Sequence, residues 1–371
     1  MKILVAPDAF GGTLTAPEAA RAIIEGWHRH APDDELTQAA MADGGPGFVD
    51  VLHEGRGGDL AVVTVRGPAG AEVPITILHE GGTAYIESAQ ACGLHLADPP
   101  DPMNASSFGV GQAIDAALAA GARRIVVGLG GSATNDAGAG MLAALGATAD
   151  VRLDAGPHGL RGVTAVDLAA ARDRLDGIDV VIAADVDLAL LGMFGATKTF
   201  GPQKGLTEDE ILTVDGVLDR FVVAACGPTP PDRRVADAKG AGAAGGLGFA
   251  LMLLGGRVVS GIDLVADAVG LTTQAASHDL VITGEGTYDF SSRAGKAVYG
   301  VASVAAAAAR PCIVLAGQVS VGSREMRAMG VESAYAVADV VGIEASLSDA
   351  FASLATLAER VARTWSPDSH E

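Results

Sequence analysis

The chain has 371 residues, of which 49% are hydrophobic and 19% charged, a balance that excludes a disordered protein and predicts two or three folded domains. Its 25 basic and 45 acidic residues give a formal net charge of −20, which disfavours binding to nucleic acid or to an anionic membrane surface. The three scattered cysteines and the lack of a long uncharged run indicate a soluble, cytoplasmic protein without a disulfide framework.

The N-terminal segment predicts a strand, a capped helix and a second strand. A β-branched run at 3–6 precedes Thr15-Ala-Pro-Glu18, a capping box that begins a helix ending near His30. A strand at 36–41 completes a βαβ unit, which implies a parallel sheet. Between 60 and 88 the pattern changes to short alternating runs separated by glycine-rich turns, which is typical of antiparallel hairpins.

Helices and strands alternate again in the rest of the chain. Ser106 and Ser107 precede a helix expected to end near Ala120, and a buried strand at 124–129 leads into a glycine-rich loop and a helix to about Leu145. Further strands are expected at 179–184, 279–283, 311–316 and 334–338.

These elements predict two α/β domains with the active site in the cleft between them. The first is a Rossmann-like domain with a mostly parallel sheet, built from both chain ends at 1–66 and 275–371. The second, at 67–274, has a mixed sheet that carries the hairpins.

Glycines and acidic residues occur together where five predicted strands end, the edge at which open α/β sheets bind ligands. Each segment alone is more typical of a plain turn, because Asp-Gly and Gly-Gly are common turn dipeptides. Five of them in one chain favour a shared active-site rim. Their acids are Asp8, Asp43, Asp136, Asp185, Asp187, Glu285 and Asp289.

The loop from Gly130 to Asp136 carries the sharpest signal. Its glycine pair lets the backbone approach a ligand, Ser132 and Thr134 add hydroxyl donors, and the next helix directs its N-terminus toward a bound phosphate. Asp136 is interpreted either as a Mg²⁺ ligand or as a cap of that helix.

Three lysines near glycines or prolines are candidate anchors for a phosphate or a carboxylate, and a solvated loop lysine is an equally good interpretation of each. They are Lys198, Lys204 and Lys296. No Ser/His/Asp or Cys/His arrangement is traceable, so no covalent nucleophile is expected.

A second hypothesis is a nicotinamide-dependent oxidoreductase acting on a small hydroxy acid. Gly128-Leu-Gly130-Gly-Ser-Ala133 matches the dinucleotide-binding pattern G-x-G-x-x-A between a strand and a helix, and Asp150 lies near the spacing of a ribose-binding acid. The lack of an evident His-Asp or Tyr-Lys catalytic pair weakens this hypothesis. A Walker A loop is absent from the sequence, which excludes a P-loop enzyme.

Taken together, the segments resemble the bacterial type I glycerate kinase family. The resemblance runs almost end to end, through APDAFGGTLTAPEAA, MADGGPG, SSFGVGQAI, GLGGSATNDAGAGML, DVDLALLG, FGPQKG, AGAAGGLG, DLVITGEGTYD and GKAVYGVA. It implies a kinase that uses ATP and Mg²⁺ to phosphorylate a hydroxyl of D-glycerate, usually giving 2-phosphoglycerate. Its partners are then small-molecule substrates, and a homodimer is an open expectation.

Phosphoryl transfer requires metal-binding acids, donors around the phosphates and a base or hydrogen bond at the attacking hydroxyl. We expect metal binding by Asp136 and Asp185. The expected catalytic residues are Asp187, Asp289, Asp43 and Lys296. The expected phosphate- and substrate-binding residues are Asp8, Gly130, Gly131, Ser132, Thr134, Asn135, Lys198, Lys204 and Glu285.

The chain departs from the family pattern at three places. Gly11 stands where members often carry a lysine, Leu188-Ala189 replaces Asn-Pro, and Ser291-Ser292 replaces Gln-Thr. A related hydroxy acid as substrate is therefore open. So is a third hypothesis, a ligand-binding member of the family without catalytic activity.

Overall fold

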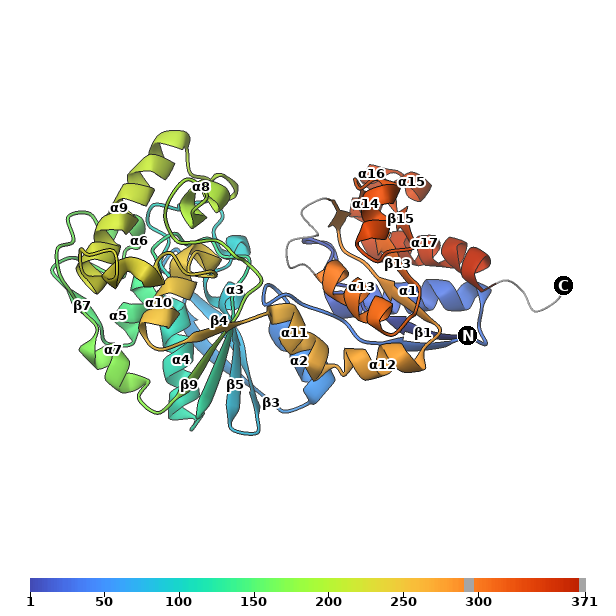
Figure 1. Ribbon diagram of the computed structural model, residues 1–371, viewed down its shortest axis with the longest axis horizontal. Helices are drawn as coiled ribbons and strands as arrows, with labels where there is room; N and C mark the ends of the chain where they lie inside the picture. Colours follow the sequence, from blue (N-terminus) through green and yellow to red (C-terminus); the bar gives the residue numbers. More distant parts are fainter. Residues whose placement is uncertain (290–296, 367–371) are drawn as a thin grey trace. The chain divides into compact units, whose positions relative to one another are not determined.

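The computed structural model describes residues 1–289 and 297–366, so Lys296 and the Ser291-Ser292 departure lie outside the described residues. The chain divides into two compact units. The first comprises Met1–Asp43, Asp50–Arg56 and the chain from Gly261 onward, and the second comprises Gly44–Val49 and Gly57–Ser260. Figure 1 shows the blue N-terminal and orange-red C-terminal segments together in the first unit.

A five-stranded, wholly parallel sheet lies at the centre of the first unit, in the order β15-β13-β11-β1-β2. Its three middle strands are almost entirely buried apolar runs, as expected for strands covered on both faces. This strand order is the flavodoxin-like form of a doubly wound fold. The order in which the chain adds strands to the sheet reverses between β1 and β11. The strands are β1 (Lys2–Val5), β2 (Glu35–Gln38), β11 (Leu280–Thr283), β13 (Cys312–Ala316) and β15 (Ser333–Ala336).

Helices cover this sheet, and α1 and α17 pack on each other as well as on one of its faces (Figure 1). A Cβ at Gly26 of α1 would lie 2.0 Å from the Ala355 carbonyl oxygen of α17, so only glycine allows this close approach. Thr15 and Glu18 form the predicted capping box of α1. The helices are α1 (Ala16–His30), α2 (Phe48–Arg56), α11 (Gly261–Ala268), α12 (Leu271–Ser277), α13 (Ala297–Ala307), α14 (Ser323–Ala328), α15 (Ala338–Val341), α16 (Ile343–Ser348) and α17 (Ala350–Trp365); β12 (Thr287–Tyr288) and β14 (Gln318–Val319) form a short parallel pair.

A six-stranded mixed sheet, in the order β10-β9-β6-β5-β4-β3, forms the second unit. The β3/β4 and β4/β5 pairs are antiparallel hairpins, and the other pairs are parallel. The predicted fold class, a parallel sheet and a mixed sheet with hairpins, is therefore confirmed. The strands are β3 (Asp59–Arg66), β4 (Glu72–Glu80), β5 (Thr83–Glu87), β6 (Arg124–Gly128), β9 (Asp179–Ala183) and β10 (Arg257–Val259), with β7 (Thr148–Ala149) and β8 (Val166–Asp167) as a separate antiparallel pair.

One hydrophobic core joins this sheet to its helices. No helix within the described ranges is both long and apolar enough to cross a membrane. The helices are α3 (Ser88–Cys92), α4 (Phe108–Ala119), α5 (Ala139–Ala144), α6 (Gly156–Gly159), α7 (Ala169–Arg174), α8 (Ala196–Phe200), α9 (Glu208–Cys226) and α10 (Leu247–Leu253), with 3₁₀-helices at Leu94–Leu96, Pro202–Lys204, Asp232–Val235 and Ala243–Gly246.

The units differ from the expected domains at three places, one of which is Gly44–Val49, a short segment of the second unit. β3 lies within the range 1–66 expected for the first domain, yet it pairs along its whole length with β4 of the second unit. α11 and α12 precede residue 275, yet both pack with α13 in the first unit. Each element belongs to the unit in which its packing partners lie. The local sequence does not indicate those partners.

Candidate active site

A cavity of about 390 Å³ lies at the carboxyl end of the parallel sheet in the first unit. The loops that follow β1 and β11 line it, and the Asp8 N–H donates to the Gly284 carbonyl at 2.8 Å, which holds the two loops side by side. Because strand order reverses between these two strands, the cavity occupies the switch point at which doubly wound folds bind ligands.

Four carboxylates line this cavity, and all four belong to the predicted set. They are Asp8, Asp43, Glu285 and Asp289. Glu285 is buried, and Asp8 accepts a hydrogen bond from the Ala9 N–H at 2.7 Å. The described residues that line the cavity include no lysine or arginine.

The carboxylates suit a hard divalent cation such as Mg²⁺, which prefers oxygen ligands. The described residues include no group of three or more His, Cys, Asp or Glu side chains placed to hold a metal by themselves. Mg²⁺ usually takes one or two protein carboxylates and fills its remaining positions with phosphate oxygens and water.

The remaining wall of the cavity is largely apolar. Its side chains are Phe10, Val337, Leu347, Ala350 and Leu354. Sequence reasoning missed the last four, because they come from the C-terminal segments after β15 and no local motif links them to the acids. Gly11 also lines the cavity, with a φ of +27° that would strain any other residue there.

The Lys204 side chain is buried against the Gly130–Asp136 loop in the second unit and donates hydrogen bonds to it. The side chain is 4% exposed, and Nζ donates to the Ser132 hydroxyl at 3.1 Å and to the Thr134 carbonyl at 2.7 Å. Burial lowers the pKa of Lys204 to about 8, although the nearby Cys92 and Asp136 act against that decrease. Burial raises the pKa of Cys92 to about 12. Lys204 is therefore a buried brace of this loop and not a solvated loop lysine.

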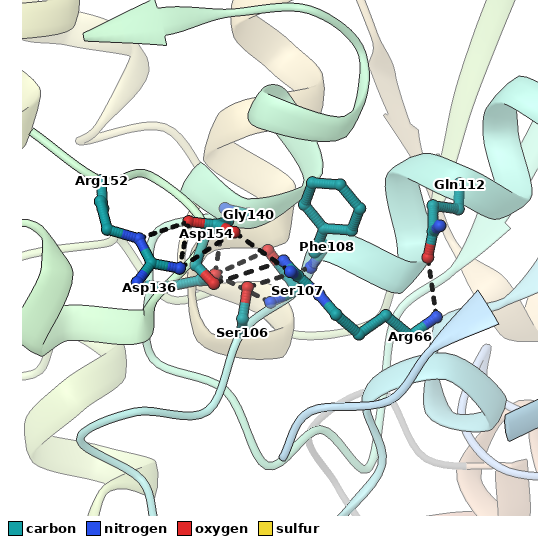
Figure 2. Close-up of polar contacts among 9 residues, drawn as sticks. All are labelled: Arg66, Ser106, Ser107, Phe108, Gln112, Asp136, Gly140, Arg152 and Asp154. Atoms are coloured by element: carbon teal, nitrogen blue, oxygen red, sulfur yellow. Dashed lines mark hydrogen bonds and ion pairs between the residues drawn. The ribbon is translucent and has the colours of Figure 1, made fainter. Parts of the chain in front are cut away.

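Asp136 is fully buried and accepts four hydrogen bonds. Ser107 donates from its backbone N–H at 2.9 Å and from its hydroxyl at 2.8 Å, and the Gly140 N–H donates at 3.2 Å (Figure 2). The Gly138 N–H donates at 3.1 Å. Burial raises the pKa of Asp136, while these hydrogen bonds act in the opposite direction.

At the start of α5, where we expected a phosphate, Asp136 already accepts from two of the backbone donors. α5 begins at Ala139 rather than near Asp136, and the Asp136 carboxylate already occupies the N–H groups of Gly138 and Gly140. With six residues, α5 is also short for a helix that binds a phosphate. The local acid satisfies the donors that a phosphate would need.

Two side chains of the same loop have unsatisfied polar atoms. The Thr134 hydroxyl and both amide atoms of Asn135 are buried without a hydrogen-bond partner among the described residues. Buried polar groups of this kind mark positions for water or a ligand. The binding roles of Ser132, Thr134 and Asn135 stay predictions.

Lys198 and Asp187 have partners of their own. Lys198 lies on α8 rather than in a loop, with its Nζ 3.1 Å from an Asp215 carboxylate oxygen on α9. Asp187 is 75% exposed and lies 2.7 Å from the Lys239 Nζ, in a surface pair of the kind that contributes little stability. Asp185 follows β9 and is half-buried. The structure therefore brings four acids together in the first unit and the Gly130–Asp136 loop with Lys204 in the second.

The second unit also contains a polar cluster that the sequence did not predict, formed by Arg66, Phe108, Arg152 and Asp154. Arg66 stacks 3.7 Å from the centre of the Phe108 ring and donates to the Asp154 carboxylate at 3.1 Å, where Arg152 also binds (Figure 2). Asp154 bridges the two arginines, so we interpret the cluster as a structural link between β3, α4 and the segment near α6.

The structure argues against the dinucleotide-binding hypothesis, because it leaves no space for a pyrophosphate beside Gly128 and Gly130. A Cβ at Gly130 would lie 2.5 Å from the Gly45 Cα, and a Cβ at Gly128 would lie 2.6 Å from the Gly44 carbonyl oxygen. The chain's own backbone therefore occupies the close approach that a pyrophosphate would need at these glycines.

The fold and this cavity define a doubly wound α/β protein with an acidic ligand site. Residues 3–366 match the model of the Glycerate kinase family. The chain is 39% identical to a glycerate kinase of Bacillus subtilis, covering 98% of this chain and 96% of the relative, and 38% identical to a glycerate 2-kinase of Escherichia coli, covering 95% and 93%. A crystal structure provisionally assigned as glycerate kinase 2 from Salmonella typhimurium LT2 is similar with a TM-score of 0.77 at 36% identity, covering 98% of each chain.

The chain belongs to the glycerate kinase family. The prediction of an enzyme, a kinase and transferase of this family, is thereby confirmed.

Proposed function

We propose that this protein transfers the γ-phosphoryl group of ATP to a hydroxyl of D-glycerate and forms 2-phosphoglycerate. The observation that carries the proposal is the near end-to-end similarity to glycerate kinases, one of which is a glycerate 2-kinase. The acid-lined cavity at the switch point of the parallel sheet supports it, because phosphoryl transfer relies on acids that hold a metal–phosphate complex.

Mg²⁺ would be held by one or two of the cavity acids Asp8, Asp43, Glu285 and Asp289. When bound, it neutralises charge on the phosphates and favours attack at phosphorus. Asp136 is better assigned a structural role, since both of its carboxylate oxygens already accept hydrogen bonds from the protein. Asp185 remains a candidate ligand.

The attacking hydroxyl of the acceptor has to lose a proton as its oxygen bonds to phosphorus. Asp43 and Asp289 are the two predicted catalytic acids that the cavity holds, and a carboxylate in either position can accept that proton. Asp187 lies on an exposed segment beside Lys239, so we give it lower priority as the base.

Steady-state ADP release with Mg²⁺ and ATP, across D-glycerate, L-glycerate, lactate and tartronate, tests the proposal. We expect turnover with D-glycerate above the other acids and none after chelation of the metal by EDTA. Turnover only with a different acid would assign another substrate to the same kinase. Ligand binding without ADP release would favour the non-catalytic hypothesis, and oxidation of NAD(P)H with a hydroxy-acid precursor would favour the oxidoreductase. A cytoplasmic location and a homodimer stay predictions.

A further inference from the structure

We propose that the cavity of the first unit is the nucleotide site, and that α16 forms the wall against which the purine base lies, with Leu347 as its principal contact. This inference rests on the proposed function, because it takes ATP as the phosphoryl donor. It assigns a base-contacting element to a segment for which neither the sequence motifs nor the comparisons indicate a role.

The first step is the division of the cavity into two chemically different halves. Asp8, Asp43, Glu285 and Asp289 form its acidic side, from the segments that follow β1, β2 and β11. The opposite side comes from the segment after β15 and consists of Val337, Leu347, Ala350 and Leu354. A ligand that uses both halves needs a metal-associated, charged end and an extended apolar end.

A hydroxy acid such as glycerate does not satisfy that requirement. Each of its three carbons carries oxygen, so it has no apolar face to bury against Leu347 or Leu354. A cavity of about 390 Å³ also falls in the size range of sites for nucleotide-sized ligands. A purine nucleotide has both features, a flat base of low polarity and phosphates that bind a metal.

The second step concerns the exposure of α16. Leu347 is 60% exposed and Ile343, one turn earlier on the same helix, is 58% exposed. Leu347 lines the cavity, whereas Ile343 is not among its lining residues. Ser346 also lines the cavity, but its hydroxyl donates back to the Ile343 carbonyl at 2.6 Å, so we assign the contact of α16 with the ligand mainly to the apolar Leu347 side chain.

The phosphates of a nucleotide bind Mg²⁺, and the carboxylates that line the cavity are of the kind that complete the coordination of this ion. We therefore expect ADP to bind more tightly with Mg²⁺ than in EDTA.

Isothermal titration calorimetry with ADP and Mg²⁺ tests the inference on wild type, Leu347→Asp and Ile343→Asp. The two variants place the same charge on the same helix at matched exposure. We expect Leu347→Asp to raise the Kd of Mg²⁺–ADP by about tenfold or more and Ile343→Asp to change it by less than about twofold. An unchanged Kd in Leu347→Asp, or equal weakening in both variants, would overturn the inference.

Titration with Mg²⁺ and inorganic tripolyphosphate separates the base from the phosphates. Because this ligand has no base, Leu347→Asp should leave its Kd unchanged, and a loss equal to that for ADP would contradict contact with the base. Failure of the proposed function has a different signature: selective loss of ADP binding in Leu347→Asp, with no turnover of any hydroxy acid by wild type, would support this site and reject glycerate phosphorylation. Turnover of D-glycerate by wild type, together with a Kd for Mg²⁺–ADP that Leu347→Asp leaves unchanged, would support the proposed function and reject this site.

Discussion

At the scale of single residues, the buried carboxylate of Asp136 joins the segment before α4 to the start of α5. It accepts hydrogen bonds from Ser107, Gly138 and Gly140 in a site without solvent access. Removing one partner of such a set leaves several buried donors unsatisfied, which is far more costly than losing one exposed hydrogen bond.

We therefore predict that Asp136→Ala lowers the free energy of unfolding by about 2–4 kcal/mol. Urea denaturation followed by circular dichroism measures the change. Asp187→Asn is the control, because it removes a charge from an exposed position and should leave the melting temperature almost unchanged. Equal stability of wild type and Asp136→Ala would show that the carboxylate is not a structural cap and would return it to the list of metal ligands.

Lys204 gives the protein a defined dependence of stability on pH. Its pKa in the folded state, about 8, lies below the ordinary lysine value, so the unfolded chain binds more protons between those two values. Stability contributed by this group therefore rises as the pH rises through about 8. Because Cys92 and Cys312 have pKa values raised to about 12 and oppose this trend above pH 9, the informative window is pH 8 to 9.

In that window, wild type should gain about 1 kcal/mol of unfolding free energy relative to Lys204→Met. Urea titrations of both proteins at pH 8.0, 8.5 and 9.0 measure the difference. A constant difference over this range would mean that Lys204 keeps an ordinary pKa and is not buried as described.

The cavity acids belong to the residue scale as well. Asp43→Asn and Asp289→Asn should each lower kcat by at least about 10²-fold, the usual size of a general-base or metal-ligand contribution, with little change in melting temperature. The rate is measured by ADP release, and circular dichroism checks the fold. A folded variant with near-normal kcat would assign that acid to structure.

At the scale of elements, two strained turns interlock in the second unit. Ala137 and Ala244 have φ values of +52° and +49°, and the Ala137 N–H donates to the Gly245 carbonyl at 3.0 Å. A Cβ at Gly245 would lie 1.8 Å from the Thr134 carbonyl oxygen. The segment around Gly245 thus packs against the Gly130–Asp136 loop, and the absence of a side chain at Gly245 allows the two backbones to lie in contact.

Gly245→Ala should therefore destabilise the protein by more than about 2 kcal/mol, since it adds both a backbone clash and a left-handed alanine. Gly216→Ala on α9 is the matched control: nothing lies within 4 Å of the new Cβ, and alanine favours the helix by up to about 1 kcal/mol. Denaturation midpoints of the two variants should move in opposite directions. Two small, similar shifts would contradict this packing.

Local patterns predicted the elements well. The capping box at Thr15 and Glu18 placed α1, and the alternating runs between 60 and 88 predicted the hairpins of β3, β4 and β5. Hydrophobic periodicity does not indicate which distant strand a strand pairs with, so it did not predict that β3 belongs to the second unit. Local sequence also did not predict that α5 begins at Ala139.

The candidate site was predictable to the same extent. The rule that ligands bind at strand ends indicated Asp8, Asp43, Glu285 and Asp289, because acids after parallel strands meet at one edge. It did not indicate that Lys204 is buried or that Lys198 pairs with Asp215, since both depend on tertiary packing. The apolar wall with Leu347 comes from a remote segment without a motif.

At the scale of the whole molecule, a chain with a net charge of −20 is proposed to bind two anions, ATP and glycerate. Four carboxylates line the cavity that we propose for the nucleotide, and Lys204 is buried within the second unit. We therefore expect nucleotide binding to be stronger with a divalent cation than without one.

Identification of the product by ³¹P NMR, after incubation of the protein with ATP, Mg²⁺ and D-glycerate, tests the central claim most directly. We predict stoichiometric formation of ADP and 2-phosphoglycerate by wild type, and about a hundredth of these products or less by Asp289→Asn in the time that wild type needs to complete the reaction. Hydrolysis of ATP to inorganic phosphate without a phosphoglycerate, or no consumption of ATP by a folded wild-type protein that binds Mg²⁺–ADP, would contradict it.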